Sequence, residues 1–440
     1  MKLNKERILD NFRAMIRIRT VSEESSADEQ TFAAFRTLLR ERYPAVFAAG
    51  ESWLIGKRGV LIRIPGKTAE KPSVLMAHYD VVPADASKWR FDPFSAVLDD
   101  GRIYGRGTLD TKSTLCAIME AASSLIENGA RPAHDLYLSF GGEEEISGSC
   151  ASEIVSFLKE RGVRPDLVLD EGGSVIPEGL PGVKRRAAMI GIAEKGTANY
   201  RISVSTGRAG HASVPPKTTA VGRVARAAAR IESHPFPTRL SRPTELMFRE
   251  LARYVPAYEK PAFSRVRNFA LPIRLLAPHL GDTFNAMVRT TCAFTNCRAD
   301  SSFNVLPERA EMGVNVRLLE GDTVESAAAY LRKVIADPCV SVELIAGSDP
   351  TPVSEINCGA MDTLKRVIAS VWKDAVIAPY QLNGGTDARF FTEISDHIYR
   401  FSPMVMTKEE RSTVHGIDES IAVTSLLQTV IFYIRLIRQI

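Results

Sequence analysis

The sequence predicts an α/β fold with a smaller α+β domain inserted into it, and three observations support this prediction. Apolar strand-forming runs at 73–77, 136–140 and 167–169 alternate with helical patterns, which is typical of α/β sheets. After Lys195 the order changes to strand, helix, insertion, two strands, helix and strand, which fits a small α+β sandwich. Beyond residue 350 two helices and a strand follow, so we expect the C-terminal part to complete the first domain.

Length and composition are those of a soluble globular protein with two or three domains. The chain has 440 residues, of which 45% are hydrophobic and 25% charged. Its net charge of +4, from 56 basic and 52 acidic residues, is too even to indicate a nucleic acid or an anionic membrane as a partner. Six scattered cysteines contain no Cys-x-x-Cys pair, which favours reduced thiols over disulfides. No secretory signal and no run of 18 apolar residues is present, so we expect a cytoplasmic protein.

The periodicity of apolar residues gives the elements of the first domain in order. Two amphipathic helices are expected within 5–43. Pro65 and Gly66 mark the turn after the first strand, and Gly129 ends the first helix after Asp110. The other predicted elements are strands at 60–64, 73–77, 136–140 and from Leu167, and helices at 114–128 and 149–160.

The larger domain is expected to be discontinuous. It takes residues 1–194 and 351–440, while residues 195–350 form the inserted domain, which has an extra insertion at about 238–285. Residues 235–285 are rich in proline and predict irregular structure. The predicted elements of this second half are strands at 200–204, 290–295, 310–319, 340–345 and 398–401, and helices at 219–231, 323–335, 359–372 and 423–437.

Polar side chains follow the apolar strands at the points where they end. His78 and Asp80 follow one strand and point to the same side, because side chains alternate with period 2. Ligands bind beyond the carboxyl ends of strands in open α/β sheets, so these groups are candidates for one site. Taken singly, each group has a structural alternative, namely a core histidine, a helix N-cap for Asp110 or a solvated acidic turn. The candidates are His78, Asp80, Asp110, Glu143, Glu144, Asp170, Glu171 and His415.

This set of side chains predicts a metal site. Adjacent buried carboxylates repel each other, so a buried cluster needs cations or shared protons. Two imidazoles and several carboxylates without thiolates suit Zn²⁺, Co²⁺ or Mn²⁺. The number of carboxylates predicts two ions that share a bridging group, and such a pair activates a water and polarises a carbonyl. A carboxylate beside that water would act as the general base.

The order of the motifs resembles a known enzyme family over about residues 60–440. This is the dizinc amidohydrolase family that includes aminoacylase, carboxypeptidase S and succinyl-diaminopimelate desuccinylase, and the resemblance is nearest to the branch of carboxypeptidase S and the N-fatty-acyl-amino-acid hydrolases. Each motif is weak alone, whereas the ordered set is specific. The motifs are His78–Pro83, Tyr104–Lys112, Gly142–Glu145, Leu169–Gly173, Ala193–Gly196, Gly210–Ser213, Asn304–Pro307, Gly384–Asp387 and Val414–Gly416.

The resemblance implies an αβα sandwich catalytic domain with a ferredoxin-like lid and dimerisation domain. It also implies two Zn²⁺ per subunit, with Co²⁺ or Mn²⁺ as alternatives, and a homodimer. His78 and Glu171 would hold one ion, Glu144 and His415 the other, and Asp110 would bridge them. The choice of Glu171 over Asp170 rests on the resemblance alone.

The resemblance implies catalytic roles for three further residues. Asp80 would orient His78, and Glu143 would be the general base. His211, on the lid, would stabilise the oxyanion, in relatives often across a dimer interface.

The resemblance also implies a site for the substrate carboxylate. Asn304 and Arg317 would hold it, and Arg389 would assist from the loop that contains Gly385 and Thr386. A guanidinium suits this task because it makes bidentate, charge-assisted contacts with carboxylates. Departures from the family pattern at Glu320-Gly321, Ser302-Phe303 and Asp418 leave the details of the substrate open.

The predicted function is hydrolysis of the amide bond of N-acyl amino acids or of small peptides with a free carboxylate. A dipeptidase or exopeptidase is the alternative within this class. A non-catalytic, metal-dependent binding protein and a purely structural acidic protein are alternatives from other classes.

The extra insertion is open to two interpretations, because it contains many large apolar residues. These residues either pack internally or form dimer contacts, or they form an apolar wall for a long acyl chain. They are Leu246, Phe248, Leu251, Tyr254, Phe263, Phe269, Leu271, Ile273, Leu275 and Leu276.

Overall fold

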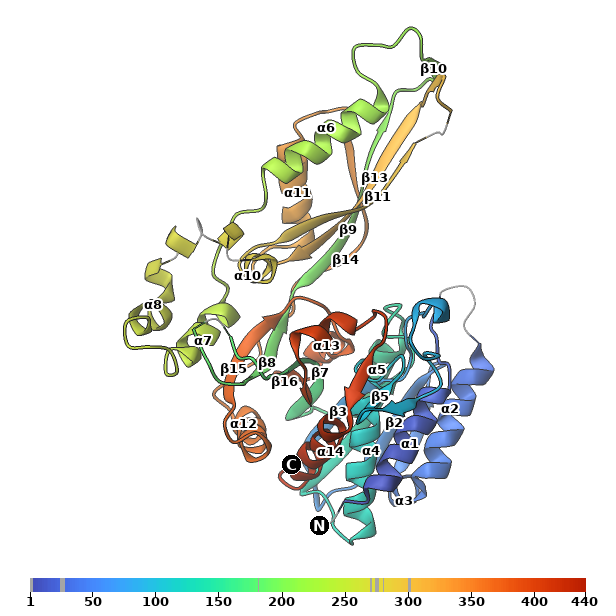
Figure 1. The fold of residues 1–440 in the computed structure, drawn as a ribbon, viewed down its shortest axis with the longest axis vertical. Coiled ribbons are helices and arrows are strands. Elements are labelled where there is room, and N and C mark those ends of the chain that lie inside the picture. Colours follow the sequence, from blue (N-terminus) through green and yellow to red (C-terminus); the bar gives the residue numbers. More distant parts are fainter. Residues whose placement is uncertain are drawn as a thin grey trace.

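The larger lobe of the molecule is built on one mixed sheet of eight strands (Figure 1). The computed structural model describes residues 3–23, 28–180, 182–269, 271–273, 277–279, 281–299 and 302–440. The strands β3, β6, β7 and β16 run parallel in the middle of the sheet, whose order is β1-β2-β6-β3-β7-β16-β8-β15. Their bounds are β1 Glu51–Ile55, β2 Gly59–Ile64, β3 Thr68–His78, β6 His134–Gly141, β7 Leu167–Ile176, β8 Ala187–Glu194, β15 Val376–Leu382 and β16 Ile398–Val405.

Helices cover both faces of this sheet. The alternation of side chains along β3 sends Leu75 into the core under one helical layer and Val74 and Met76 into the core under the other. The first layer contains α1 Lys5–Arg17, α2 Glu29–Arg42, α3 Pro44–Ala49, α4 Lys112–Glu127, α12 Gly359–Val371 and α14 Val423–Ile437, and the second contains α5 Cys150–Glu160 and η4 Asp387–Glu393. The predicted αβα sandwich is therefore confirmed.

A small sheet at one end of this lobe joins segments that are far apart in the sequence. Its strands are β4 Val97–Asp99, β5 Arg102–Tyr104 and β17 Ser420–Ala422, in the order β17-β5-β4. The short helices η1 Ala86–Lys88 and α13 Lys408–Thr413 lie in the same two segments. The pairing of β5 with β17 holds the loop before Asp110 near the loop that carries His415.

The smaller lobe is an antiparallel sheet of four strands with two helices (Figure 1). The chain leaves the large sheet at the end of β8 and returns to it at β15. The long strands and the helices follow the predicted order, whereas the two-residue strands β10 and β12 were not predicted, and the lobe has its own apolar core. The elements are β9 Gly196–Ser205, β10 Gly210–His211, α6 Ala220–Ser233, β11 Thr291–Ala299, β12 Val305–Leu306, β13 Arg309–Leu318, α11 Val324–Ile335 and β14 Ser341–Ser348.

The extra insertion is helical, although irregular structure was predicted. Prolines mark the first turns of two of its helices, where a missing N–H costs nothing, and Ser241 caps α7 by accepting a hydrogen bond from Thr244. Met247 and Leu251 of α7 pack on Val376 and Ala378 of β15, so the insertion covers the edge of the large sheet. The helices are α7 Arg242–Leu251, α8 Lys260–Ser264, η2 Val266–Phe269, η3 Ala277–His279 and α10 Asp282–Met287, while Leu275 and Leu276 lie outside the described residues. Among the described residues, no helix is long and apolar enough to cross a membrane.

Candidate metal centre

His78, at the end of β3, faces two carboxylates from other parts of the large lobe. Its Nε2 lies 2.8 Å from Asp110 Oδ1 and 3.2 Å from Glu171 Oε1. Its Nδ1 lies 3.0 Å from the backbone oxygen of Asp80 and 3.3 Å from Oδ1 of the same residue. An imidazole that donates from Nδ1 to an acceptor of this kind leaves the lone pair of Nε2 free for a metal ion.

His415 faces the other oxygen of the same Asp110. Its Nε2 lies 2.9 Å from Asp110 Oδ2 and 3.1 Å from Glu145 Oε2. Asp110 therefore offers one carboxylate oxygen to each imidazole. The donor atoms form two groups, one from His78, Asp110 and Glu171 and the other from Asp110, Glu145 and His415, and within each group they lie within 4.8 Å of one another. A carboxylate in this position is placed to bridge two cations.

The donor set fits two divalent cations. Hydrogen bonds to Asp110 and Glu145 raise the pKa of His415 to about 10. Burial alone would lower the pKa of His78, but Glu171, Asp110 and Asp80 together raise it well above its usual range. Glu145 Oε1 is buried and has no hydrogen-bond partner among the described residues, although buried acceptors are normally satisfied. Two imidazoles with three carboxylates suit Zn²⁺, Co²⁺ or Mn²⁺.

The three consecutive glutamates differ from the prediction by one residue. Glu145, and not Glu144, lies against His415. Glu143, the predicted general base, accepts a hydrogen bond from the thiol of Cys150 instead. Glu144 is half-buried, and burial raises the pKa of its carboxyl well above the usual range, with further contributions from Glu171 and other carboxylates. The resemblance placed the roles one residue too early, and the structure separates the three side chains because the chain turns here.

Asp80 fixes the register of this turn. Its fully buried carboxylate accepts hydrogen bonds from the backbone N–H of Glu144, at 3.2 Å, and of Glu145, at 3.1 Å. Ser22 donates a third hydrogen bond, at 2.8 Å. Asp80 thus contacts His78, as predicted, and also holds the backbone of the two glutamates nearest the histidines.

A buried ion pair that was not predicted joins the Asp110 loop to the His415 loop. Arg106 Nη1 lies 2.6 Å from Glu419 Oε2, and both side chains are buried. Glu419 Oε1 accepts from the backbone N–H of Leu109, at 2.7 Å, and of Asp110, at 3.3 Å, while Arg106 donates to the carbonyl of His415 at 3.1 Å. His415 has a φ of +60°, which is uncommon for a residue other than glycine, so its backbone needs such support.

Asp170 and Glu171 have different tasks, which the sequence left open. Asp170 Oδ2 accepts a hydrogen bond from the backbone N–H of Ala388, at 2.9 Å, so this carboxylate positions the loop at the start of η4. Glu194 supports the same loop: it accepts from Thr386 Oγ1 at 2.8 Å and pairs with buried Arg400 at 2.6 Å. Of the two neighbouring carboxylates, only Glu171 contacts His78.

The predicted carboxylate-binding residues lie in two places. Arg317, on β13, donates to Thr197 Oγ1 at 2.9 Å, and burial together with the charge of nearby Arg389 lowers its pKa. Asn304 and His211 instead lie together at the far tip of the smaller lobe, where β10 pairs with β12 (Figure 1). Within one chain, the structure does not bring His211 or Asn304 to the histidines of the metal centre.

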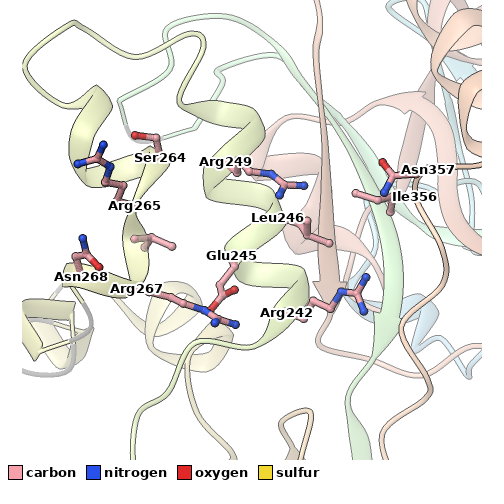
Figure 2. Close-up of a pocket in the computed structure, with 11 residues that line it drawn as sticks. Arg242, Glu245, Leu246, Arg249, Ser264, Arg265, Arg267, Asn268, Ile356 and Asn357 are labelled. Carbon is pink, nitrogen blue, oxygen red and sulfur yellow. The ribbon is translucent and has the colours of Figure 1, made fainter.

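Two hollows flank the insertion. A cleft of about 500 Å³ lies between α7 and the segment around η2, and Figure 2 shows the arginines that line it. They are Arg242, Arg249, Arg265 and Arg267, and none of the metal-centre residues lines this cleft. A second cavity, of about 580 Å³, lies between the insertion and the large sheet and reaches Gly172 and Gly173, which directly follow Glu171.

Comparison with known proteins places the chain among metallopeptidases. The sequence profile of the peptidase family M20/M25/M40 matches residues 74–439. The chain is 34% identical over 443 residues to the N-fatty-acyl-amino acid synthase/hydrolase PM20D1.1 of Danio rerio, covering 99% of this chain and 86% of that protein. It is 32% identical over 423 residues to the probable carboxypeptidase S-like 2 of Dictyostelium discoideum, covering 95% of this chain and 81% of that protein. The crystal structure of the M20 family metallo-carboxypeptidase Sso-CP2 from Sulfolobus solfataricus matches the fold with a TM-score of 0.70, at 17% identity and 98% coverage of both chains.

Proposed function

The chain belongs to the peptidase family M20/M25/M40, and from this membership and the geometry of the site we propose that it hydrolyses the amide bond of N-acyl amino acids. The observation that carries the proposal is the pair of histidine–carboxylate groups that share Asp110, with Glu144 beside them. The names of the relatives favour a fatty-acyl group as the acyl part of the substrate.

His78 and Glu171 would hold one divalent cation, Glu145 and His415 the other, and Asp110 both. When bound, such ions lower the pKa of a water molecule and polarise the carbonyl of the scissile amide. Zn²⁺ is the proposed metal, with Co²⁺ or Mn²⁺ as alternatives, because a donor set of imidazoles and carboxylates without thiolates suits all three ions.

Glu144 is the residue that we assign to proton transfer, in place of Glu143. It lies next to Glu145 on the turn that Asp80 holds, and it contacts neither imidazole. Its carboxylate would accept a proton from the attacking water and donate it to the nitrogen of the leaving amino acid. Burial, together with neighbouring carboxylates, raises the pKa of Glu144, and a carboxyl with a raised pKa suits a group that must take up and release a proton.

Arg317 and Arg389 would bind the free carboxylate of the amino-acid part of the substrate. The positive charges of these two guanidinium groups repel each other, and a carboxylate bound between them would offset this repulsion. The backbone carbonyl of Thr386, which follows Gly385, holds Arg389 in place by accepting a hydrogen bond from the Arg389 N–H.

His211 would reach the metal centre of a second copy of the chain. It lies at the tip of the smaller lobe beside exposed apolar side chains, Val214 and Phe303, which is typical of a surface that packs on a partner. In a homodimer the tip of one copy would bring His211 and Asn304 to the substrate bound by the other, with His211 stabilising the oxyanion.

Peptide hydrolysis is a second candidate activity, favoured by the carboxypeptidase S-like relatives. The two activities are separated by measuring release of free amino acid from an N-fatty-acyl amino acid and from a dipeptide with the same C-terminal residue. The Zn²⁺-loaded protein should prefer the first, and a chelator should abolish the activity. Preference for the dipeptide would assign an exopeptidase, and activity that survives full metal removal would contradict both candidates.

A further inference from the structure

The cavity between the insertion and the large sheet is lined in part by residues that directly follow a carboxylate of the metal centre in the sequence. Gly172, Gly173 and Ser174 of β7 line it, and they directly follow the ligand Glu171. From the other side Arg411 lines it, on the helix α13 that ends two residues before His415. The cavity thus borders the residues that directly follow Glu171, a donor of one group, and a residue four positions before His415, a donor of the other group.

The interior of this cavity is apolar. Its volume of about 580 Å³ lies within the range of sites that enclose small molecules. The aromatic ring of Phe248 packs on Phe263, with ring centroids 5.2 Å apart, and on Phe284, at 6.3 Å. The other apolar lining residues include Ile176, Leu180, Met189, Met247, Leu251 and Met287.

Charge is confined to one lining residue, and that charge is already paired. Arg411 donates to Glu178 at 2.8 Å and to the carbonyl of Met406 at 2.6 Å. Near the loop of Gly384, Asn383 also lines the cavity, and its Oδ1 is buried without a partner among the described residues. A ligand of this cavity therefore needs an uncharged apolar body, with a hydrogen-bond donor such as an amide N–H near Asn383.

We propose that this cavity binds the alkyl chain of the acyl group and that the helical insertion sets the preference for long chains. The inference rests on the proposed function, because the scissile amide must lie at the metal centre for its acyl part to enter beside Glu171. It gives the insertion a role in substrate choice in addition to its packing on β15. Burial of each further methylene should raise kcat/KM about fourfold until the cavity is full.

The test compares the hydrolysis of N-acetyl, N-octanoyl and N-palmitoyl derivatives of one amino acid. Ala262 of α8 lines the cavity, and Ala262→Trp should fill part of it. This variant should lose at least tenfold in kcat/KM for the palmitoyl substrate and less than twofold for the acetyl substrate. Ala257→Trp is the control, because Ala257 is an exposed residue of the insertion that does not line the cavity. It should leave both values unchanged.

The inference would be overturned if Ala262→Trp lost the same factor in kcat/KM for the palmitoyl and the acetyl substrate, or if kcat/KM of the wild type did not depend on chain length. Either result would leave the proposed amide hydrolysis intact. A second readout does not need hydrolysis, namely calorimetric binding of 1-dodecanol, which has an alkyl chain but no carboxylate for the metal. The metal-loaded wild type should bind one molecule per chain, and Ala262→Trp at least tenfold more weakly. No binding to the wild type would overturn the inference even if hydrolysis of every substrate failed.

Discussion

Three consecutive glutamates have three different environments in this structure. Glu143 bonds to Cys150, Glu144 lies among carboxylates without touching an imidazole, and Glu145 contacts His415. The sequence identified the cluster and the chemistry of its partners. It could not assign the members, because the choice depends on hydrogen bonds from the turn to Asp80, some 65 residues earlier.

The different environments predict different effects of substitution at this turn. Glu145→Ala should lower the number of tightly bound Zn²⁺ ions per chain and reduce kcat/KM by at least a hundredfold, because it removes a metal donor. Glu143→Ala should keep both values within about threefold of the wild type, and is the matched control on the same turn. Metal content by atomic spectroscopy and rates of amide hydrolysis check this. A large loss of kcat/KM in Glu143→Ala with its metal retained, together with full metal content and activity in Glu145→Ala, would restore the assignment made from sequence, in which Glu143 is the general base.

Lys195 predicts a pH dependence of stability. Its ammonium is buried and donates to the carbonyls of Ala286, at 2.5 Å, and Arg289, at 2.7 Å, and burial lowers its pKa to about 8, with a contribution from Arg317. In the unfolded chain the pKa is about 10.4, so the unfolded state binds more protons between pH 8 and pH 10 and stability must rise with pH there.

We therefore expect the free energy of unfolding of the wild type, relative to Lys195→Met, to increase between pH 7 and pH 10 by up to about 3 kcal/mol. Denaturant titrations of both proteins at several pH values measure the difference. A difference that stays constant, or falls, over this range would contradict the assignment.

At the scale of elements, most of the fold was accessible from periodicity. The predicted helix at 114–128 and strand at 136–140 correspond to α4 and β6, because both are long apolar patterns in the core. Strands β8 and β15 were missed. The run that forms β8, Ala187–Glu194, is rich in alanine and glycine and carries little strand signal, although every residue in it is buried. The insertion was assigned as irregular since its prolines lie in first turns, where a helix tolerates them.

The ion pair between Arg106 and Glu419 gives a prediction at this scale. Glu419→Gln should destabilise the fold by about 3–5 kcal/mol, because it leaves a buried guanidinium without its partner. Glu393→Gln removes an exposed pair with Lys159 and should cost less than about 1 kcal/mol. Chemical denaturation measures both values. Equal small costs would mean that the buried pair does not hold the loops of Asp110 and His415 together.

At the scale of the whole molecule, the distance between the tip and the metal centre is the feature that no sequence pattern indicates. Motif order places His211 and His415 in one functional set, yet β10 and the large lobe lie at opposite ends of the chain's fold (Figure 1). The order of motifs indicates which residues act in the same site, whereas the arrangement of copies in an oligomer determines which copy contributes each residue. The homodimer and the cytoplasmic location stay predictions.

Mixing of two inactive variants tests the proposed exchange of residues between copies. His211→Ala and Glu144→Gln should each be inactive, but a mixed dimer has one site with Glu144 from one chain and His211 from the other. Subunit exchange should therefore restore about a quarter of wild-type activity, since half of the dimers are mixed and each has one intact site. Activity that never rises on mixing, in a sample shown by native mass spectrometry to contain mixed dimers, would place His211 in the site of its own chain.

The most direct test of the account is the metal content and the steady-state kinetics of Glu144→Gln, measured on the same preparation. We predict that this variant binds two Zn²⁺ per chain like the wild type, keeps its KM for an N-fatty-acyl amino acid within about threefold, and loses at least a hundredfold in kcat, because only proton transfer is removed. A variant that keeps both metals and hydrolyses the amide at the wild-type rate would contradict the central claim that Glu144 is the general base of a dinuclear amidohydrolase.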